Sequence, residues 1–345
     1  MALCAPRLQA PLRGDITCRL DRQRFARSRF GDLSWVLFVA ALVLVCVGDA
    51  SAQAPPLGLW APLPGGGHGE KKSMLEARAG YMWGWNEIRL RDGDSPNLLG
   101  SPHIRPSKKE VILDSLALGL HGERFFTEDL AVGVQLWGNV PTENRTDFFF
   151  DTLGPDRDPR VARAWDTRAR YLSGDLSLAW YLGLGGAPYR AGLVLGYRYT
   201  NFRYDSNRNS SPEAGTFRDD MHIHVPYVGI HYSNVRFAGT VVTLNLSWSV
   251  LALSRYDATR QLPGDFPNPV TTYIDGHSLT GKWFDSMLGW YVPVSSTATV
   301  GIFARYNYLE LSGGATAKSG VPSTRFSLDS RHHLIFCGAG VTYVF

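Results

Sequence analysis

The sequence predicts an all-β protein, an antiparallel transmembrane β-barrel of about ten strands that is preceded by a cleaved signal peptide. Three observations predict this fold. From Ser73 onward, about ten stretches have period-two alternation, and each is near or above the roughly 9 to 11 residues that a tilted strand needs to cross a bilayer. The connections between them alternate in length. The chain is also rich in glycine and aromatic residues, as many turns and aromatic girdles require.

The N-terminal segment has the features of a signal peptide. Trp35 to Val47 is an apolar run of thirteen residues, which is shorter than the ~20 residues of a membrane-spanning helix. Arginines precede this run, and Ala50-Ser51-Ala52 follows it with the small residues that a signal peptidase recognises. We predict cleavage after Ala52 or Ala54, so that residues 1–52 are the signal peptide. An uncleaved anchor is the alternative.

Cleavage changes what the charges and cysteines imply. Residues 1–52 contain seven arginines and four aspartates, and removing them from the 35 basic and 31 acidic residues leaves 28 and 27. A mature net charge of about +1 gives no reason to expect nucleic-acid binding. Cys337 alone remains, so an intrachain disulfide is impossible. We find no metal-binding or phosphate-binding motif and predict neither a metal nor a cofactor.

Residues 53–72 are rich in Pro and Gly and are predicted to be a flexible segment, with the barrel over residues 73–345. Five long connections alternate with four short ones, as in a ten-stranded barrel with both termini in the periplasm. The long ones are expected around Asp92 to Pro96 and over Thr142 to Arg163, Asp205 to Arg218, Tyr256 to Thr271 and Ser312 to Ser327. The short ones are expected at Phe125 to Glu128, Gly183 to Gly186, Ser233-Asn234 and Ser295-Ser296.

The alternation in two of the predicted strands indicates which residues face the lipid and which face the lumen. One has a mostly apolar and aromatic face that is expected to meet lipid: Tyr189, Ala191, Leu193, Leu195, Tyr197 and Tyr199. In the next, Met221, Ile223 and Val225 alternate with Asp220, His222 and His224, and we expect the polar set to point into the lumen. Because ten strands enclose a narrow interior, side chains should fill it rather than leave an open channel.

The last strand, Gly340 to Phe345, alternates and ends on an aromatic residue. It resembles the closing strand of bacterial outer-membrane barrels, whose assembly machinery recognises a terminal Phe. This resemblance implies an outer-membrane location in a Gram-negative bacterium, with outer-membrane lipid and the barrel assembly machinery as partners, the latter through Phe345. A protein partner is not indicated.

Several scaffold stretches resemble the omptins, which are ten-stranded outer-membrane proteases. The resemblance rests on Tyr189 to Tyr197, Val225 to Ile230, Ser247-Trp248 and Gly289 to Val292, and on the ending of the chain. It implies an Asp and a His two residues apart near the top of strand seven, facing an acidic pair above strands three and four.

The sequence departs from the omptin catalytic pattern. Leu251 to Asp257 lacks the Asp-x-His, and Arg255 stands near the expected His, where a guanidinium cannot act as a base. Opposite it, Asp147 and Asp151 lie four residues apart. A displaced Asp-x-His pair, Asp220 and His222, occurs one strand earlier, and this spacing places both side chains on one face of a strand.

The candidate catalytic residues are therefore Asp147, Asp151, Asp220 and His222, with the Asp orienting an imidazole that activates water. The alternative is that these polar groups fill the lumen and bind neighbouring strands. A further alternative concerns the arginines around the second long connection, which either neutralise lipopolysaccharide phosphates or form a solvated loop. These arginines are Arg157, Arg160, Arg163, Arg168 and Arg170.

Three classes of function follow. The first is a non-catalytic barrel that uses its long extracellular loops for surface contact or envelope assembly, which we prefer because the omptin scaffold is present without its catalytic motif. The second is a surface hydrolase with the displaced Asp/His site, either an omptin-like endopeptidase or an enzyme that acts on lipid. The third is a narrow pore.

Overall fold

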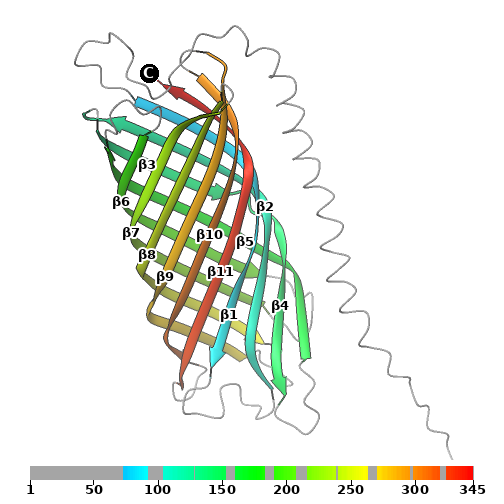
Figure 1. Cartoon of the computed structure of the whole chain (residues 1–345). Helices are drawn as coiled ribbons and strands as arrows, with labels where there is room; N and C mark the ends of the chain where they lie inside the picture. Colours follow the sequence, from blue (N-terminus) through cyan, green and yellow to red (C-terminus); the bar gives the residue numbers. More distant parts are fainter. Residues whose placement is uncertain are drawn as a thin grey trace, which may run out of the picture. The chain divides into compact units, whose positions relative to one another are not determined.

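The computed structural model describes residues 73–91, 104–127, 129–152, 160–182, 190–206, 216–237, 240–262, 270–295, 298–318 and 324–344 (Figure 1). The predicted signal peptide and residues 53–72 lie outside this part of the chain. Nearly all of the described residues belong to β-strands. Among them, no helix has the length and hydrophobicity that a membrane span requires.

The described strands form one antiparallel sheet that closes into a barrel, because β1 pairs with β2 on one side and with β11 on the other. The strands are β1 (Ser73–Arg91), β2 (Ile104–Phe125), β3 (Leu130–Asn139), β4 (Glu143–Thr152), β5 (Arg160–Leu182), β6 (Arg190–Ser206), β7 (Thr216–Phe237), β8 (Thr240–Leu262), β9 (Val270–Pro293), β10 (Ala298–Lys318) and β11 (Thr324–Val344). Both β3 and β4 lie between β2 and β5. They occupy one position in the ring, which confirms the prediction of about ten strands.

The last strand closes the barrel against the first. In the register of this pair, Met74 lies opposite Val344 and Arg91 lies opposite Ser327. The predicted pairing of the C-terminal strand with the strand that starts near Ser73 is therefore confirmed. In Figure 1, β11 runs toward the end of the barrel that carries the C-terminus, and β1 runs toward the opposite end. Because outer-membrane barrels have short periplasmic turns, we call the end at which β1 begins and β11 ends periplasmic, and the other end extracellular.

At the extracellular end the strands are longer than the sequence predicts. The expected loop Thr142 to Arg163 is largely strand, since β4 covers Glu143–Thr152 and β5 begins at Arg160. Likewise, β8 continues to Leu262 and β10 to Lys318. These extensions carry many polar residues, because their outer wall lies beyond the apolar band. In sequence, such a strand looks like a loop.

The two faces of the barrel wall exchange polarity partway along β7. Near the periplasmic end, Ile230 and Val228 are exposed on the outer wall while Tyr227 is buried in the lumen. Nearer the extracellular end, the buried residues are apolar and the outward ones polar. The inward residues there are Met221, Ile223 and Val225, and the outward ones are Asp220, His222 and His224.

The expectation that Asp220, His222 and His224 face the lumen is therefore wrong. The periodicity of the strand is correct, but the assignment of its two faces is reversed. In a bilayer the outer wall must be apolar, whereas a wall that projects into water has its apolar side inside, as in a soluble protein. For β6 the prediction holds within the band, since Leu193, Leu195 and Tyr197 are exposed and Arg198 is buried.

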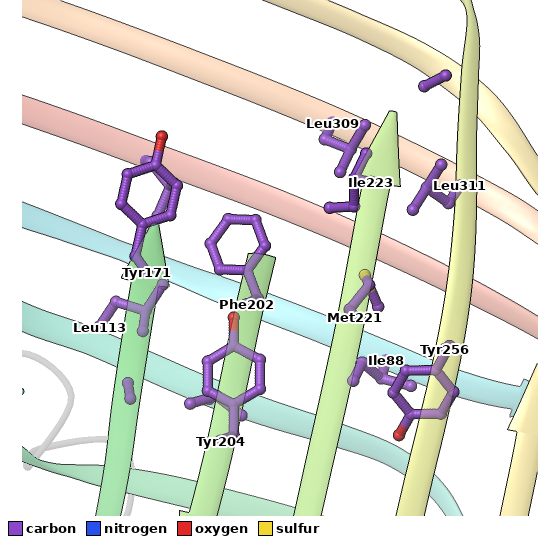
Figure 2. Close-up of a cluster of buried hydrophobic side chains, with 14 of the residues drawn as sticks. Ile88, Leu113, Tyr171, Phe202, Tyr204, Met221, Ile223, Tyr256, Leu309 and Leu311 are labelled. Carbon is purple, nitrogen blue, oxygen red and sulfur yellow. The ribbon is translucent and has the colours of Figure 1, made fainter. Parts of the chain in front are cut away.

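The extracellular half of the lumen is filled by apolar side chains. In Figure 2, Tyr171 and Phe202 lie side by side on neighbouring strands, with Met221, Ile223 and Tyr256 further round the barrel. Leu309 and Leu311 complete the cluster from the opposite wall. Most of these side chains are at most 2% exposed. The narrow interior is thus filled, as predicted, although the side chains in this half are not the ionisable ones that the sequence suggested.

Candidate functional sites in the lumen and on the outer wall

A layer of aromatic side chains crosses the lumen beside the buried ionic groups. Trp137 contacts Phe303 and Phe336, with ring centroids 5.6 and 5.5 Å apart. The guanidinium of Arg305 lies 5.3 Å from the Trp137 ring centroid and 5.7 Å from that of Phe336, and it also binds Asp285. Cation–π contacts therefore join the aromatic layer to the ionic groups.

The periplasmic half of the lumen contains a network of buried ion pairs. Asp285 accepts two hydrogen bonds from Arg305, at 2.8 and 3.1 Å. Its Oδ2 also lies 3.4 Å from Nη1 of Arg198, and Arg198 donates to Asp175 at 2.9 Å. Tyr227 donates to the other oxygen of Asp175 at 2.7 Å. The network ties five strands together and occupies the space that a pore would need.

Two small cavities remain among these groups. They measure about 80 and 40 Å³ and share Arg78, His121 and His231 in their walls. Above them, the described lumen is packed by the aromatic layer and the apolar cluster. At roughly 10 to 15 Å³ for one water position, these cavities have room for a few waters and not for a continuous channel.

The extracellular half also holds buried polar groups, and these bind one another. Lys109 and Asp219 form an ion pair in which both side chains are 1% exposed. A hydrogen-bonded chain runs from Tyr204 through Asn86 and Ser330 to Nε2 of His332. His332 lies in the lumen and His333 on the outer wall, as their adjacent positions predict. Because these groups bind one another, we interpret the chain as structural.

The structure brings two of the predicted catalytic residues together, on the outer wall. Nε2 of His222 lies 3.3 Å from Oδ1 of Asp220, and the His222 side chain is 39% exposed. Nδ1 of the same ring lies 2.7 Å from the hydroxyl of Tyr199 on β6. Asn201 donates to Asp220 at 2.7 Å and fixes the carboxylate. We call Asp220, His222, Tyr199 and Asn201 the outer-wall cluster.

Two other outer-wall histidines have a tyrosine partner. The Tyr197 hydroxyl lies 2.5 Å from Nδ1 of His224, and the Tyr306 hydroxyl lies 3.0 Å from Nδ1 of His333. His333 also stacks on Trp85, with ring centroids 4.5 Å apart. Among the described outer-wall histidines, His222 is the one whose imidazole has both a tyrosine and a carboxylate within 4 Å.

The acidic pair does not join the outer-wall cluster. Asp147 lies on β4, on the face opposite Thr146, whose hydroxyl contacts Thr167 in the lumen. It binds Arg145 with a 2.8 Å hydrogen bond. Asp151 also belongs to β4, opposite Arg105 on β2, and its side chain lies outside the described residues.

The strand register separates Asp147 widely from Asp220. Asp147 pairs with Arg163 of β5, whereas the row that contains Asp220 meets β5 at Arg170, seven residues further along. At about 3.3 Å per residue and 4.8 Å per strand, this offset is more than ~20 Å. Asp147 therefore cannot share a water with His222, and the four candidates do not form one site.

The arginines around the second long connection lie on the outer wall where the structure describes them. Arg168 and Arg170 are exposed on the outer wall of β5, and the side chains of Arg157, Arg160 and Arg163 lie outside the described residues. Within the described residues, no group of three or more His, Cys, Asp or Glu is arranged to hold a metal ion. The sequence did not single out Tyr199 as a partner of His222, because cross-strand neighbours depend on the register.

Comparison with known proteins shows which solved structures have a similar fold. No protein-family model and no curated protein sequence matches the chain. Among solved structures, it is similar to the outer membrane protease OmpT from Escherichia coli, with 14% identity, a TM-score of 0.64, and coverage of 79% of this chain and 97% of that one. Others are the outer membrane protein OprG from Pseudomonas aeruginosa (14% identity, TM-score 0.35, 80% and 98% covered) and the translocator domain of the autotransporter NalP from Neisseria meningitidis (11%, 0.36, 91% and 97%).

The likeness to OmpT confirms the omptin-like scaffold at the level of the fold. The chain therefore has the fold of an outer-membrane β-barrel, and the outer membrane of a Gram-negative bacterium stays its predicted location. At 14% identity the likeness says nothing of activity.

Proposed function

We propose that the protein is a sealed, non-catalytic barrel that acts through its extracellular strand extensions and loops, in surface contact or envelope assembly. The observation that carries this proposal is the apolar packing of the extracellular half of the lumen, by residues such as Met221, Tyr256 and Leu309. A protease of the omptin type needs polar groups and water there, at the heads of the strands. Apolar side chains of this kind supply neither a base nor room for a peptide.

The proposal also excludes a pore. Stable ionic currents require a continuous aqueous path, and the lumen combines a buried ion-pair network with an aromatic layer and an apolar cluster. We therefore expect the protein to bind outer-membrane lipid on its wall, to leave the membrane impermeable to small solutes, and to expose its loops for contact. Lipopolysaccharide phosphates remain proposed ligands of Arg168 and Arg170.

Two measurements on the purified, refolded protein test the proposal. In planar bilayers we expect no stable single-channel conductance, and in solution no cleavage of peptides with basic residues. Stable currents would contradict the sealed lumen. Peptide cleavage that is lost in Asp220→Asn and His222→Gln would contradict the non-catalytic assignment and would support an omptin-like protease.

A second candidate function rests on one specific observation, the 3.3 Å contact between His222 and Asp220. In this candidate the protein is an outer-membrane hydrolase whose displaced Asp/His pair lies on the outer wall. The lumen is sealed in both candidates, so conductance does not distinguish them. Hydrolysis that depends on His222 does.

A further inference from the structure

The outer-wall cluster lies where the apolar band of the barrel ends. On β8, Leu253 is directly opposite His224 and is 42% exposed, while Arg255 is directly opposite His222. On β5, Leu172 is 57% exposed and lies level with Asn201. Apolar and charged side chains thus meet at the level of His222. In a bilayer, this is the boundary between hydrocarbon and headgroups.

The groups in the cluster are arranged as a hydroxyl, an imidazole and a carboxylate. Nε2 of His222 lies 3.3 Å from Oδ1 of Asp220, and the Tyr199 hydroxyl lies 2.7 Å from Nδ1 on the other side of the ring. This arrangement favours a proton on Nε2 and makes Nδ1 the basic nitrogen. A carboxylate that fixes the tautomer of a histidine makes the opposite nitrogen a general base. The cluster is thus built to accept a proton at Nδ1 from a group that lies outside the barrel wall.

A groove with charges of both signs begins at Asp220. Its volume is about 490 Å³, and its walls include Arg218, Asp257, Tyr273 and Asp275. Beside it, Arg255 carries a guanidinium that is 63% exposed. A phosphate would bind the arginines through charge-assisted hydrogen bonds, and an ammonium group would bind the aspartates. Both charges together match a zwitterionic headgroup.

From these observations we propose that the outer-wall cluster hydrolyses ester bonds of membrane glycerophospholipids that carry a zwitterionic, amine-bearing headgroup. This inference rests on the second candidate function and names its substrate class, and lipid hydrolysis by the cluster would replace the non-catalytic assignment while leaving the lumen sealed. A lipid bound to the wall places its acyl ester beside Tyr199 and His222, just below its headgroup. A soluble peptide has no such alignment, because the cluster faces the membrane boundary and not the lumen.

The reaction is an ester hydrolysis without redox change. A water molecule attacks the ester carbonyl carbon and transfers one proton to the Tyr199 oxygen as the Tyr199 proton moves to Nδ1 of His222. The tetrahedral intermediate then breaks its bond to the glycerol oxygen, and the proton returns from His222 through Tyr199 to that oxygen. The products are a fatty acid and a lysophospholipid. Tyr199 and His222 are the catalytic residues, and Asp220 is a positioning residue.

The test uses the purified full-length barrel in mixed micelles of a neutral detergent with phosphatidylethanolamine or phosphatidylglycerol. Released fatty acid is measured by mass spectrometry. We expect release from phosphatidylethanolamine, reduced at least about 100-fold in His222→Gln and at least about 10-fold in Tyr199→Phe, in line with the usual contribution of general acid–base groups. His333→Gln is the matched control, since His333 also binds a tyrosine, and it should keep full activity.

The positioning role of Asp220 is tested by a measurement that a purely structural role would leave unchanged. Asp220→Asn should lower the rate and displace its pH profile, and Asp220→Glu should restore most of the rate. Heat-modifiable migration in gels verifies that each variant is folded. Equal release by wild type and His222→Gln, or no release, overturns the inference. Peptide cleavage that depends on His222, without lipid hydrolysis, also overturns it and leaves the second candidate function standing.

Discussion

Arg305 and Asp285, on neighbouring strands inside the lumen, share two hydrogen bonds of 2.8 and 3.1 Å, and the Arg305 side chain is 1% exposed. Asp285 also faces Arg198. Asp285 is thus the carboxylate that binds Arg305, and it also lies beside Arg198, which binds Asp175 as well, so this part of the barrel depends strongly on Asp285.

We expect Asp285→Ala to destabilise the barrel by about 3 to 5 kcal/mol, because it leaves buried positive charge without a partner. The free energy of unfolding in urea, measured in detergent micelles, tests this. Asp257→Ala is the control, since Asp257 binds Arg255 at 3.0 Å on the exposed outer wall and the expected loss is below ~1 kcal/mol. Equal losses in both variants would contradict the buried network.

The reversed polarity of β7 predicts a difference between adjacent residues. In a Cys337→Ser background, Met221→Cys should resist a membrane-impermeant thiol reagent, because the Met221 side chain is buried in the lumen. His222→Cys should react readily, because that side chain lies on the outer wall. Labelling rates, measured by mass spectrometry, distinguish the two possible orientations of β7. Fast labelling at position 221 with protection at position 222 would restore the lumen-facing assignment.

Gly196 allows the Tyr227 ring to lie directly against the β6 backbone. A Cβ at residue 196 would lie 2.2 Å from Cζ of Tyr227, whose hydroxyl donates to Asp175. Gly196→Ala should therefore displace the ring, break this hydrogen bond and cost about 1 to 3 kcal/mol. Gly314→Ala, with no atom within 4 Å of the added Cβ, should change the free energy of unfolding by less than ~0.5 kcal/mol. A neutral Gly196→Ala would show that Tyr227 has room to move.

Glu310 lies beyond the apolar band on the outer wall, where hydrogen bonds from Lys282 and Tyr308 lower its pKa to about 2. Its folded pKa is below its ordinary value of 4.5. The stabilisation is therefore fully present above pH 4.5 and is lost as the pH falls toward 2. The difference in unfolding free energy between wild type and Glu310→Gln should shrink over this pH range. Titration of the Glu310 carboxyl near pH 4.5 by NMR would disprove the lowered pKa.

The sequence predicts the barrel well because period-two alternation and the sorting of connections depend on local geometry. The positions of Leu195 and Arg198 on opposite faces of β6 follow from alternation alone. The orientation of β7 does not, because apolar residues face lipid in one part of the strand and the lumen in the other. Alternation gives the two faces of a strand, and only the height of each residue relative to the membrane decides which face is inside.

The candidate site, too, can be predicted from the sequence only in part. The spacing of Asp220 and His222 correctly predicts that their side chains meet, since residues two apart share a face. Their grouping with Asp147 fails, because the strand register places Asp147 more than ~20 Å from Asp220. Tyr199 becomes a partner of His222 only through the β6–β7 register, which sequence spacing does not contain.

The exchange of polarity along the wall sets the depth at which the barrel rests in its membrane. Sinking by two residues would carry Asp220 and His222 toward hydrocarbon, and rising by two would lift Leu172 and Leu253 toward water. Both displacements are unfavourable, so the polarity of the wall holds the barrel at one height. The part of β7 beyond His224 then stands about 20 Å above the bilayer. The described strand extensions therefore rise clear of the surrounding lipid headgroups.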